Sequence, residues 1–343
     1  MFEKYRASDD VYIIAEVGQN HQGSIDIAKQ YIETFAKLGA NAVKFQMRDN
    51  EYLFSNEAFE RPYDNENSFA ETYGAHRNFL EFNMEEWYQI HACCKSVGVE
   101  FMCTPFDEPS LDRLIELNVD LLKVASFDLA NIPFLTKVAM TQKPVVISVG
   151  GGKLNHIESS VELFQSKNVD FALLHCVSEY PCPIEKLGLS SINSLIDKYP
   201  DIAVGLSDHF NGILSGPIGY MNGARVFEKH VTFNRANKGT DHSFALEPKG
   251  FENFVRDIKR TSIMNRVGDT SSLGEENVFK KLGKSICASK NIRAGETFSE
   301  DNIRGMIDVE QVIPVRESIN LIGKKSKRDY KLGELVEQSE LFK

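Results

Sequence analysis

The sequence predicts an α/β fold, a (β/α)8 TIM barrel followed by a small β-rich domain. Eight short apolar segments alternate with segments of helical periodicity through residues 1–265, which is typical of a parallel sheet covered by helices. Polar residues gather just after the apolar segments, at the strand ends where such barrels hold their active sites. An open doubly wound sheet is the alternative, but the G-x-G-x-x-G fingerprint typical of that fold is absent after the first strand.

The predicted elements follow one another in regular order. Ser24 can cap the first barrel helix, whose apolar positions recur at helical spacing until Gly39 ends it. The expected strands are residues 11–15, 41–46, 99–103, 121–125, 144–148, 171–176, 202–206 and 225–229. The expected helices are residues 25–38, 84–97, 110–117, 132–140, 155–165, 192–199, 212–222 and 249–265.

Two segments fall outside this alternation. A long insert, residues 49–83, separates the second strand from its helix, and we expect it to shape the mouth of a substrate site rather than to be a solvated loop without a role. Residues 266–282 are polar and turn-rich, so they predict a linker after a barrel domain of residues 1–265. Residues 283–343 carry short apolar runs and Gly-Glu turns, which predict a small β-rich domain that packs on a barrel, its own or a partner's.

The composition indicates an ordinary globular protein of about two domains. The chain has 343 residues and a formal net charge of −10, which argues against nucleic acid as a partner and requires local cations for any anionic substrate. No apolar run approaches ~18 residues, and the first residues lack an apolar stretch of signal-peptide type, so we expect neither a membrane span nor export. The six cysteines include no C-x-x-C pair and are expected to be reduced thiols of a cytoplasmic protein.

Two histidines end neighbouring predicted strands. His209 follows the seventh strand and His230 follows the eighth, so the barrel brings them together although 21 positions separate them. Two imidazoles suit one divalent metal with positions left open for water or substrate. Asp241 follows in a Gly-Thr-Asp-His turn. A single histidine at a strand end is more often a structural residue, and the pair gains meaning only from the residues around it.

Cations and hydroxyls end other strands of the same face. Lys44 and Lys123 supply two positive charges for a small phosphorylated anion. The hydroxyls that converge with them are those of Thr104, Ser126, Ser148 and Ser207. Glu16 and Asp128 are carboxylates on the same rim, available for orientation or proton transfer. A phosphate-bearing substrate, a carbonyl substrate and a metal together indicate an aldol-like condensation.

Eight motifs stand in order along nearly the whole chain: I-I-A-E-V-G-Q-N-H-Q-G, A-V-K-F-Q, C-T-P-F-D, K-V-A-S-F-D, H-C-V-S-E-Y-P, G-L-S-D-H, E-K-H-V-T-F and K-G-T-D-H-S-F-A-L-E-P. Together they resemble the N-acetylneuraminate (sialic acid) synthase family, and the tail resembles the antifreeze-like, or SAF, domain of that family. The resemblance implies a condensation of phosphoenolpyruvate with an N-acylated amino sugar, typically N-acetylmannosamine, to give N-acetylneuraminate. It also implies a divalent metal, Mn²⁺ with Mg²⁺ or Co²⁺ as alternatives, and a domain-swapped homodimer in which one subunit's C-terminal domain covers the other's barrel.

The resemblance also assigns roles by matching motif. It makes His209 and His230 the metal ligands. It places around phosphoenolpyruvate Lys44, Thr104, Lys123, Ser126, Ser148, Ser178, Tyr180 and Ser207. It places at the sugar or the reacting centre, as catalytic residues, Glu16, Gln46, Asp128 and Asp241.

The chain departs from the family pattern at three places. Ser148-Val149-Gly150-Gly151 stands where many bacterial members have Ser-Thr-Gly-Met, and Ser126-Phe127-Asp128 stands where many have Ser-Gly-Glu. The SAF-domain Lys-Arg-Pro, whose Arg reaches the partner's sugar site, is replaced by residues 304–308, R-G-M-I-D. The remaining candidates for that cation are Arg304, Arg316, Arg61 and Arg77.

Three acceptors and one non-enzyme function therefore stay open. The acceptor is free N-acetylmannosamine, its 6-phosphate, or a diacetamido sugar of the legionaminate or pseudaminate type. The insert resembles animal-type members, some of which take a 6-phosphorylated sugar. The alternative of another class is a sugar-binding protein that kept the barrel and lost activity, and the presence of both histidines, both lysines and Asp241 argues against it.

Overall fold

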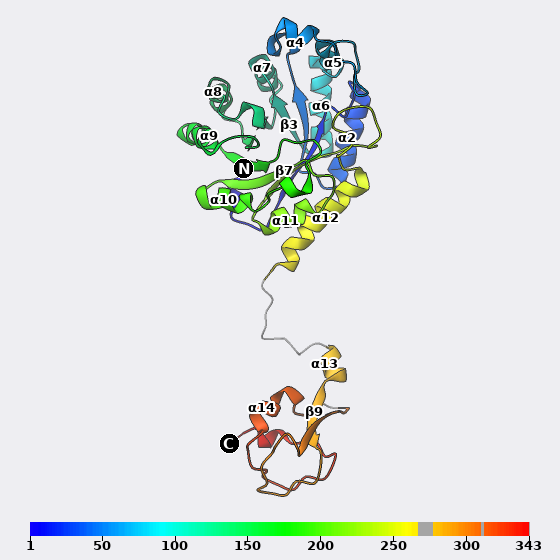
Figure 1. Cartoon of the computed structure of the whole chain (residues 1–343), viewed down its shortest axis with the longest axis vertical. Coiled ribbons are helices and arrows are strands. Elements are labelled where there is room, and N and C mark those ends of the chain that lie inside the picture. The colour runs from blue at the N-terminus through cyan, green and yellow to red at the C-terminus, as the bar shows by residue number, and fades with distance from the viewer. Residues whose placement is uncertain (267–276, 310–311, 343) are drawn as a thin grey trace. The chain divides into compact units, whose positions relative to one another are not determined.

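Eight parallel strands close into a barrel in the order β1 to β8, with β8 returning to β1 (Figure 1). The computed structural model describes residues 1–266, 277–309 and 312–342 of the chain. It forms two compact units, Met1–Arg266 and Val267–Lys343. Helices follow the strands and cover the outside of the barrel, so the predicted (β/α)8 fold is confirmed.

The strands of the barrel are β1 (Tyr12–Gly18), β2 (Ala42–Met47), β3 (Glu100–Pro105), β4 (Leu121–Val124), β5 (Val145–Ser148), β6 (Phe171–Cys176), β7 (Ala203–Asp208) and β8 (Val226–His230). Its helices are α1 (Glu3–Arg6), α2 (Ile25–Lys37), α3 (Asn50–Leu53), α4 (Asn56–Glu60), α5 (Tyr73–Phe79), α6 (Met84–Val97), α7 (Glu108–Glu116), α8 (Ile132–Met140), α9 (Leu154–Ser166), α10 (Ser191–Lys198), α11 (Ser215–Met221) and α12 (Pro248–Met264), with short 3₁₀ turns η1 (Ser126–Asp128) and η2 (Ile184–Lys186).

Strand alternation divides the apolar side chains between two layers. On β2, Val43 and Phe45 face the outer core beneath the helices, whereas Ala42 belongs to the cluster inside the barrel. The inner cluster consists of buried strand residues together with Phe2, which precedes α1, and Tyr5 of α1; the rings of both pack on Tyr12. The N-terminal end of the barrel is therefore an apolar floor, and the inward positions above it are free to carry polar groups.

The insert between β2 and α6 contains three short helices, where the sequence predicted only a long structured loop. Asp49, Ser55 and Thr72 each accept a hydrogen bond from a backbone N–H in the first turn of α3, α4 and α5. Gly74 lets α5 approach α4 closely, because a Cβ there would lie 2.3 Å from the ring of Phe59.

Other boundaries shift by only a few residues. Helix α11 begins at Ser215 rather than at the predicted residue 212, and β8 extends to include His230. All six cysteines are free, and Cys103 and Cys176 are buried. None of the helices within the described ranges combines the length and apolar character that a membrane crossing requires.

The C-terminal unit pairs β9 (Lys284–Ala288) with β10 (Ile303–Ile307) in an antiparallel sheet, and isolated bridges extend the β structure. Its other elements are α13 (Asn277–Leu282), η4 (Val315–Glu317), α14 (Ser318–Leu321) and η5 (Gln338–Glu340). Ile286, Phe298 and Tyr330 belong to a separate buried core. Residues 267–276 of the predicted linker lie outside the described residues, and α13 forms its last part. The assignment of this unit as an SAF domain stays a prediction.

Candidate active site

A polar cavity of about 260 Å³ opens at the C-terminal ends of the barrel strands. The predicted site residues that line it are Glu16, Lys44, Gln46, Thr104, Lys123, Ser126, Ser148, Tyr180, Ser207, His209, His230 and Asp241. Two predicted site residues do not line it. Ser178 lies behind Ser126, with the two hydroxyl oxygens 2.9 Å apart, and Asp128 accepts a hydrogen bond from Asn131.

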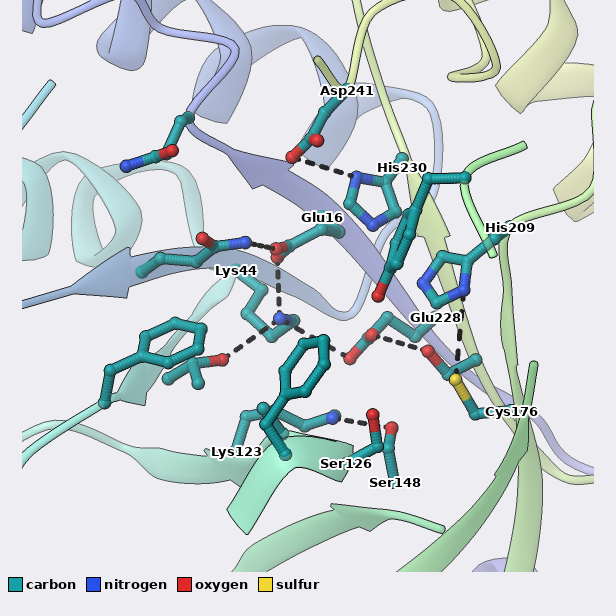
Figure 2. A pocket seen from close by; sticks show the side chains of 18 of the residues that line it. Glu16, Lys44, Lys123, Ser126, Ser148, Cys176, His209, Glu228, His230 and Asp241 are labelled. Atoms are coloured by element: carbon teal, nitrogen blue, oxygen red, sulfur yellow. Dashed lines mark hydrogen bonds and ion pairs between the residues drawn. The ribbon is translucent and has the colours of Figure 1, made fainter. Parts of the chain in front are cut away.

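Three charged groups meet at the centre of the cavity (Figure 2). Lys44 Nζ lies 2.9 Å from Glu16 Oε2 and 3.7 Å from Glu228 Oε2, and it donates to Thr104 Oγ1 at 3.2 Å. All three ionisable side chains are almost fully buried. One ammonium thus faces two carboxyl groups in a site of low dielectric, where all three cannot hold their charge equally well.

Burial and charge push the pKa values of the two carboxyl groups apart. Burial raises the pKa of Glu16 to about 7 even though Lys44 lies beside it. Burial also opposes ionisation of Glu228, but the charges of Lys123 and Lys44 outweigh burial and lower its pKa to about 2. Burial alone would lower the pKa of Lys44, yet the charges of Glu16 and Glu228 raise it. Of the two carboxyl groups, Glu228 therefore favours its negative charge and Glu16 favours a bound proton.

Glu228 was missed in the sequence although a signal for it existed. It precedes His230 by two positions on the eighth strand, so alternation places both side chains on the inner face of the barrel. Its Oε1 accepts a hydrogen bond from Ser207 at 2.9 Å.

Lys123 forms a second cationic centre. Its Nζ donates to Ser148 Oγ at 2.7 Å and to the Val124 carbonyl at 3.0 Å. Burial lowers the pKa of Lys123, and the charge of Glu228 opposes this effect without outweighing it. An anion with two charged ends would find one ammonium and its neighbouring hydroxyls at each end.

The two predicted metal ligands lie together, with ring centroids 5.3 Å apart (Figure 2). His209 Nδ1 donates a hydrogen bond to the Val177 carbonyl at 2.8 Å. In the neutral ring Nε2 is then unprotonated, and its lone pair is available to a metal. His230 Nδ1 is buried without a hydrogen-bond partner among the described residues and lies 3.8 Å from Asp241 Oδ2. Burial lowers the pKa of both imidazoles, and the charge of His209 lowers that of His230 further.

This donor set fits a divalent metal that accepts imidazole ligands, because both rings are held in the neutral form that binds metal. In residues 1–266, 277–309 and 312–342, no three His, Cys, Asp or Glu side chains gather closely enough to hold a metal on their own. Water or substrate oxygens would have to complete the coordination.

A buried ion pair lies directly behind the imidazoles. Lys229 Nζ lies 2.6 Å from Asp208 Oδ2, both side chains are fully buried, and the ammonium also donates to the Phe210 carbonyl. Ser215 donates to the same carboxylate at 2.5 Å. These contacts fix the end of β7 to β8 and so hold the residues that carry the two rings.

The outer part of the cavity is lined by two arginines and a glutamine that we did not predict as a group from the sequence. Arg48 follows β2, Arg77 belongs to α5, and Gln19 follows β1. Arg48 Nη2 donates to Gln46 Oε1 at 2.7 Å, and Gln46 Nε2 in turn donates to Glu16 Oε1 at 2.7 Å. A continuous chain of polar contacts therefore runs from Lys44 at the centre to Arg48 at the mouth.

Comparisons with known proteins identify relatives of this chain. A profile of the NeuB family matches residues 31–270. The N-acetylneuraminate-9-phosphate synthase of Mus musculus is 36% identical over 317 residues, covering 92% of this chain and 88% of that protein. The N,N'-diacetyllegionaminic acid synthase of Campylobacter jejuni is 32% identical over 335 residues, covering 95% and 98%. The crystal structure of an N-acetylneuraminic acid synthetase from Leptospira borgpetersenii in complex with citrate is 33% identical, covers 78% of this chain and 90% of that chain, and has a TM-score of 0.69.

Proposed function

Because this chain belongs to the NeuB family, whose synthases form a C–C bond between phosphoenolpyruvate and an amino sugar, we propose that it makes N-acetylneuraminate or its phosphate from an N-acetylmannosamine acceptor. The observation that carries the proposal is the meeting of two buried ammonium groups, one titratable carboxyl and two neutral imidazoles in one cavity. Such a set can hold a phosphorylated anion beside an aldehyde.

In the net reaction, C3 of phosphoenolpyruvate bonds to the aldehyde carbon of the open-chain sugar. Water is consumed, C2 of phosphoenolpyruvate becomes a keto carbon, and inorganic phosphate leaves. The chain's own part begins with binding: Lys44 and Lys123 hold the phosphate and carboxylate ends of phosphoenolpyruvate and neutralise their charge. The groups proposed to complete that binding are Thr104, Ser126, Ser148, Tyr180 and Ser207, while Ser178 would act only through its contact with Ser126.

Glu16 is proposed to be the group that takes up and releases a proton during the condensation. Its raised pKa of about 7 lets it hold a proton in one step and release it in another near neutral pH, and Gln46 fixes its orientation through the 2.7 Å hydrogen bond. Gln46 and Asp241, which line the cavity, are proposed to face the sugar. A divalent metal held by His209 and His230, with Mn²⁺ as the expected ion, would supply Lewis acidity toward the aldehyde oxygen.

Three carbons of the product come from phosphoenolpyruvate, so C6 of the sugar becomes C9 of the product. The name of the mouse relative places a phosphate on that carbon, whereas the Campylobacter relative is named for a diacetamido product. The acceptor of this chain is therefore proposed as N-acetylmannosamine or its 6-phosphate, and the diacetamido sugar is the second candidate.

The test is sugar-dependent release of phosphate from phosphoenolpyruvate, measured with each acceptor before and after exhaustive chelation. We expect release only with an aldehyde sugar, loss on chelation and recovery on adding Mn²⁺. His209→Ala and His230→Ala should abolish turnover and leave the thermal midpoint nearly unchanged. Full activity of either variant after chelation would remove the proposed metal role.

A further inference from the structure

Two arginines at the cavity mouth are not accounted for by binding of phosphoenolpyruvate. Arg48 and Arg77 line the same cavity as Lys44 and Lys123 but come from the segment after β2 and from the insert helix α5. Along β2 the inward positions are Lys44 and Gln46, and Arg48 continues that series. At roughly 3.3 Å per residue, Arg48 Cα lies about 13 Å from Lys44 Cα, so it faces the end of a substrate remote from the reacting carbons.

This part of the cavity contains hydrogen-bond donors without partners. The Arg48 side chain is only 8% exposed, yet its Nη1 is buried without a hydrogen-bond partner among the described residues. The same holds for Arg77 Nε and for Gln19 Nε2. Buried N–H groups are rarely left unpaired, because each one costs free energy that a bound acceptor oxygen would restore.

The donors are held in place by their other contacts. Gln19 Oε1 accepts from Arg77 Nη1, and Tyr73 accepts from Arg77 Nη2 at 2.7 Å. The Arg48 guanidinium lies 3.8 Å from the centroid of the Phe106 ring and donates to Gln46. A ligand that bound here would meet donors already oriented, which lowers the entropic cost of binding.

The charge of this region favours an anion with two negative charges. One counter-charge in this region is Glu81, whose Oε1 lies 3.7 Å from Arg48 Nη1 and whose pKa burial raises to about 7. Asp241 also lines the cavity. Burial, and next the charge of Arg77, lower the pKa of Arg48 to about 10. A phosphate dianion would stabilise the charge of Arg48, which Arg77 opposes, because arginine binds phosphate through paired N–H groups.

We propose that Arg48, Arg77 and Gln19 form a subsite for a phosphate monoester on the acceptor sugar, at the hydroxyl remote from the aldehyde. The inference rests on the proposed function and specifies its substrate class as the 6-phosphorylated sugar. A free sugar would present only a neutral hydroxyl to the two guanidinium groups.

The test compares kcat/KM for N-acetylmannosamine 6-phosphate and for N-acetylmannosamine at saturating phosphoenolpyruvate. The wild-type enzyme is expected to prefer the phosphorylated sugar. Arg77→Met should reduce that preference by about 10- to 100-fold, mostly through the KM of the phosphorylated sugar, because one charged hydrogen-bonding partner is lost. Arg77→Lys should restore part of the preference, since it keeps the charge and loses the planar fork.

Arg61→Met is the matched control. Arg61 is exposed, lies 4.3 Å from the same Tyr73 ring and does not line the cavity, so the preference should stay as in wild type. Equal use of both sugars by the wild-type enzyme overturns the subsite. So does an Arg77→Met variant that loses the same factor with both sugars.

A wild-type enzyme that releases phosphate with neither sugar contradicts the proposed function instead. Calorimetric binding of N-acetylmannosamine 6-phosphate to the wild-type and Arg77→Met chains then decides the subsite independently. Loss of binding in the variant supports the subsite, and equal binding overturns it.

Discussion

A substitution at Lys123 should distinguish binding of phosphoenolpyruvate from binding of the sugar. Lys123 lies on β4 with Ser148 as its side-chain partner, away from the chain of contacts that leads to the mouth. Lys123→Met keeps the length of the side chain and removes its charge. The KM for phosphoenolpyruvate should rise about 10- to 100-fold, and the KM for the sugar much less. Steady-state kinetics with each substrate varied in turn measure both values.

Lys137→Met is the control for this variant, because Lys137 is an exposed lysine of α8. It should leave both KM values unchanged. An unchanged KM for phosphoenolpyruvate in Lys123→Met would show that this ammonium only fills the barrel.

The raised pKa of Glu81 makes the free energy of unfolding depend on pH. Its folded-state pKa of about 7 lies above the ordinary value of 4.5, so the folded chain binds its proton more tightly than the unfolded chain does. The group therefore stabilises the fold below pH 4.5, and this contribution is lost as pH rises through 7. A rise from 4.5 to about 7 corresponds to at most ~3 kcal/mol.

The Glu81→Gln variant removes that dependence. Its free energy of unfolding relative to wild type should increase steadily from pH 5 to pH 8, as measured by urea denaturation. Glu57→Gln, an exposed change in the same insert, should show no such slope. A flat difference for Glu81→Gln would mean that Arg48 keeps this carboxylate ionised throughout.

At the scale of elements, the junction of β7 and β8 determines where the two imidazoles stand. The Asp208–Lys229 pair is fully buried, so loss of one partner leaves a charge without compensation. Lys229→Met should lower the free energy of unfolding by about 3–5 kcal/mol. The double variant Asp208→Asn with Lys229→Met should recover part of this loss. Single and double variants that are equally unstable would show that the lysine stem, rather than the ion pair, supports the junction.

The same elements show what the sequence could and could not predict. Periodicity located every barrel strand within a few residues, because apolar alternation is a local property of the chain. Glu228 was also within reach, since the alternation that places His230 inside the barrel places Glu228 there too. Arg77 was named only as one candidate cation, and Arg48 not at all. Arg48 continues the inward series of β2 and was therefore within reach of the same alternation. The position of Arg77 depends on how α4 and α5 pack, including the contact of Gly74 with Phe59, which no local pattern encodes.

The largest prediction concerns the whole chain, which we expect to act as a domain-swapped homodimer. If the C-terminal unit completes a partner's active site, truncation after Arg266 should raise the KM for the sugar and weaken the dimer. Binding of phosphoenolpyruvate should survive, because all of its proposed contacts lie in the first unit. Sedimentation and calorimetry measure the two effects.

Mixing supplies the decisive comparison. A full-length His209→Ala chain and a truncated wild-type barrel are each expected to be impaired. Activity that returns on mixing means that a C-terminal unit works on another subunit's barrel. If labelled subunits exchange and the mixture stays inactive, the unit serves its own barrel or none.

The apolar floor of the barrel has a consequence for the order in which substrates bind and products leave. Phe2, Tyr5 and Tyr12 belong to the apolar cluster at the N-terminal end, so among the described residues of the barrel we expect reactants to enter and leave through the cavity at the opposite end. Phosphoenolpyruvate, held at the level of Lys44 just above the floor, must then bind first and the sugar second. Inorganic phosphate, released at the deepest point, must leave last. It should therefore inhibit competitively against phosphoenolpyruvate and not against the sugar, and any other pattern in product-inhibition kinetics would require a second way out.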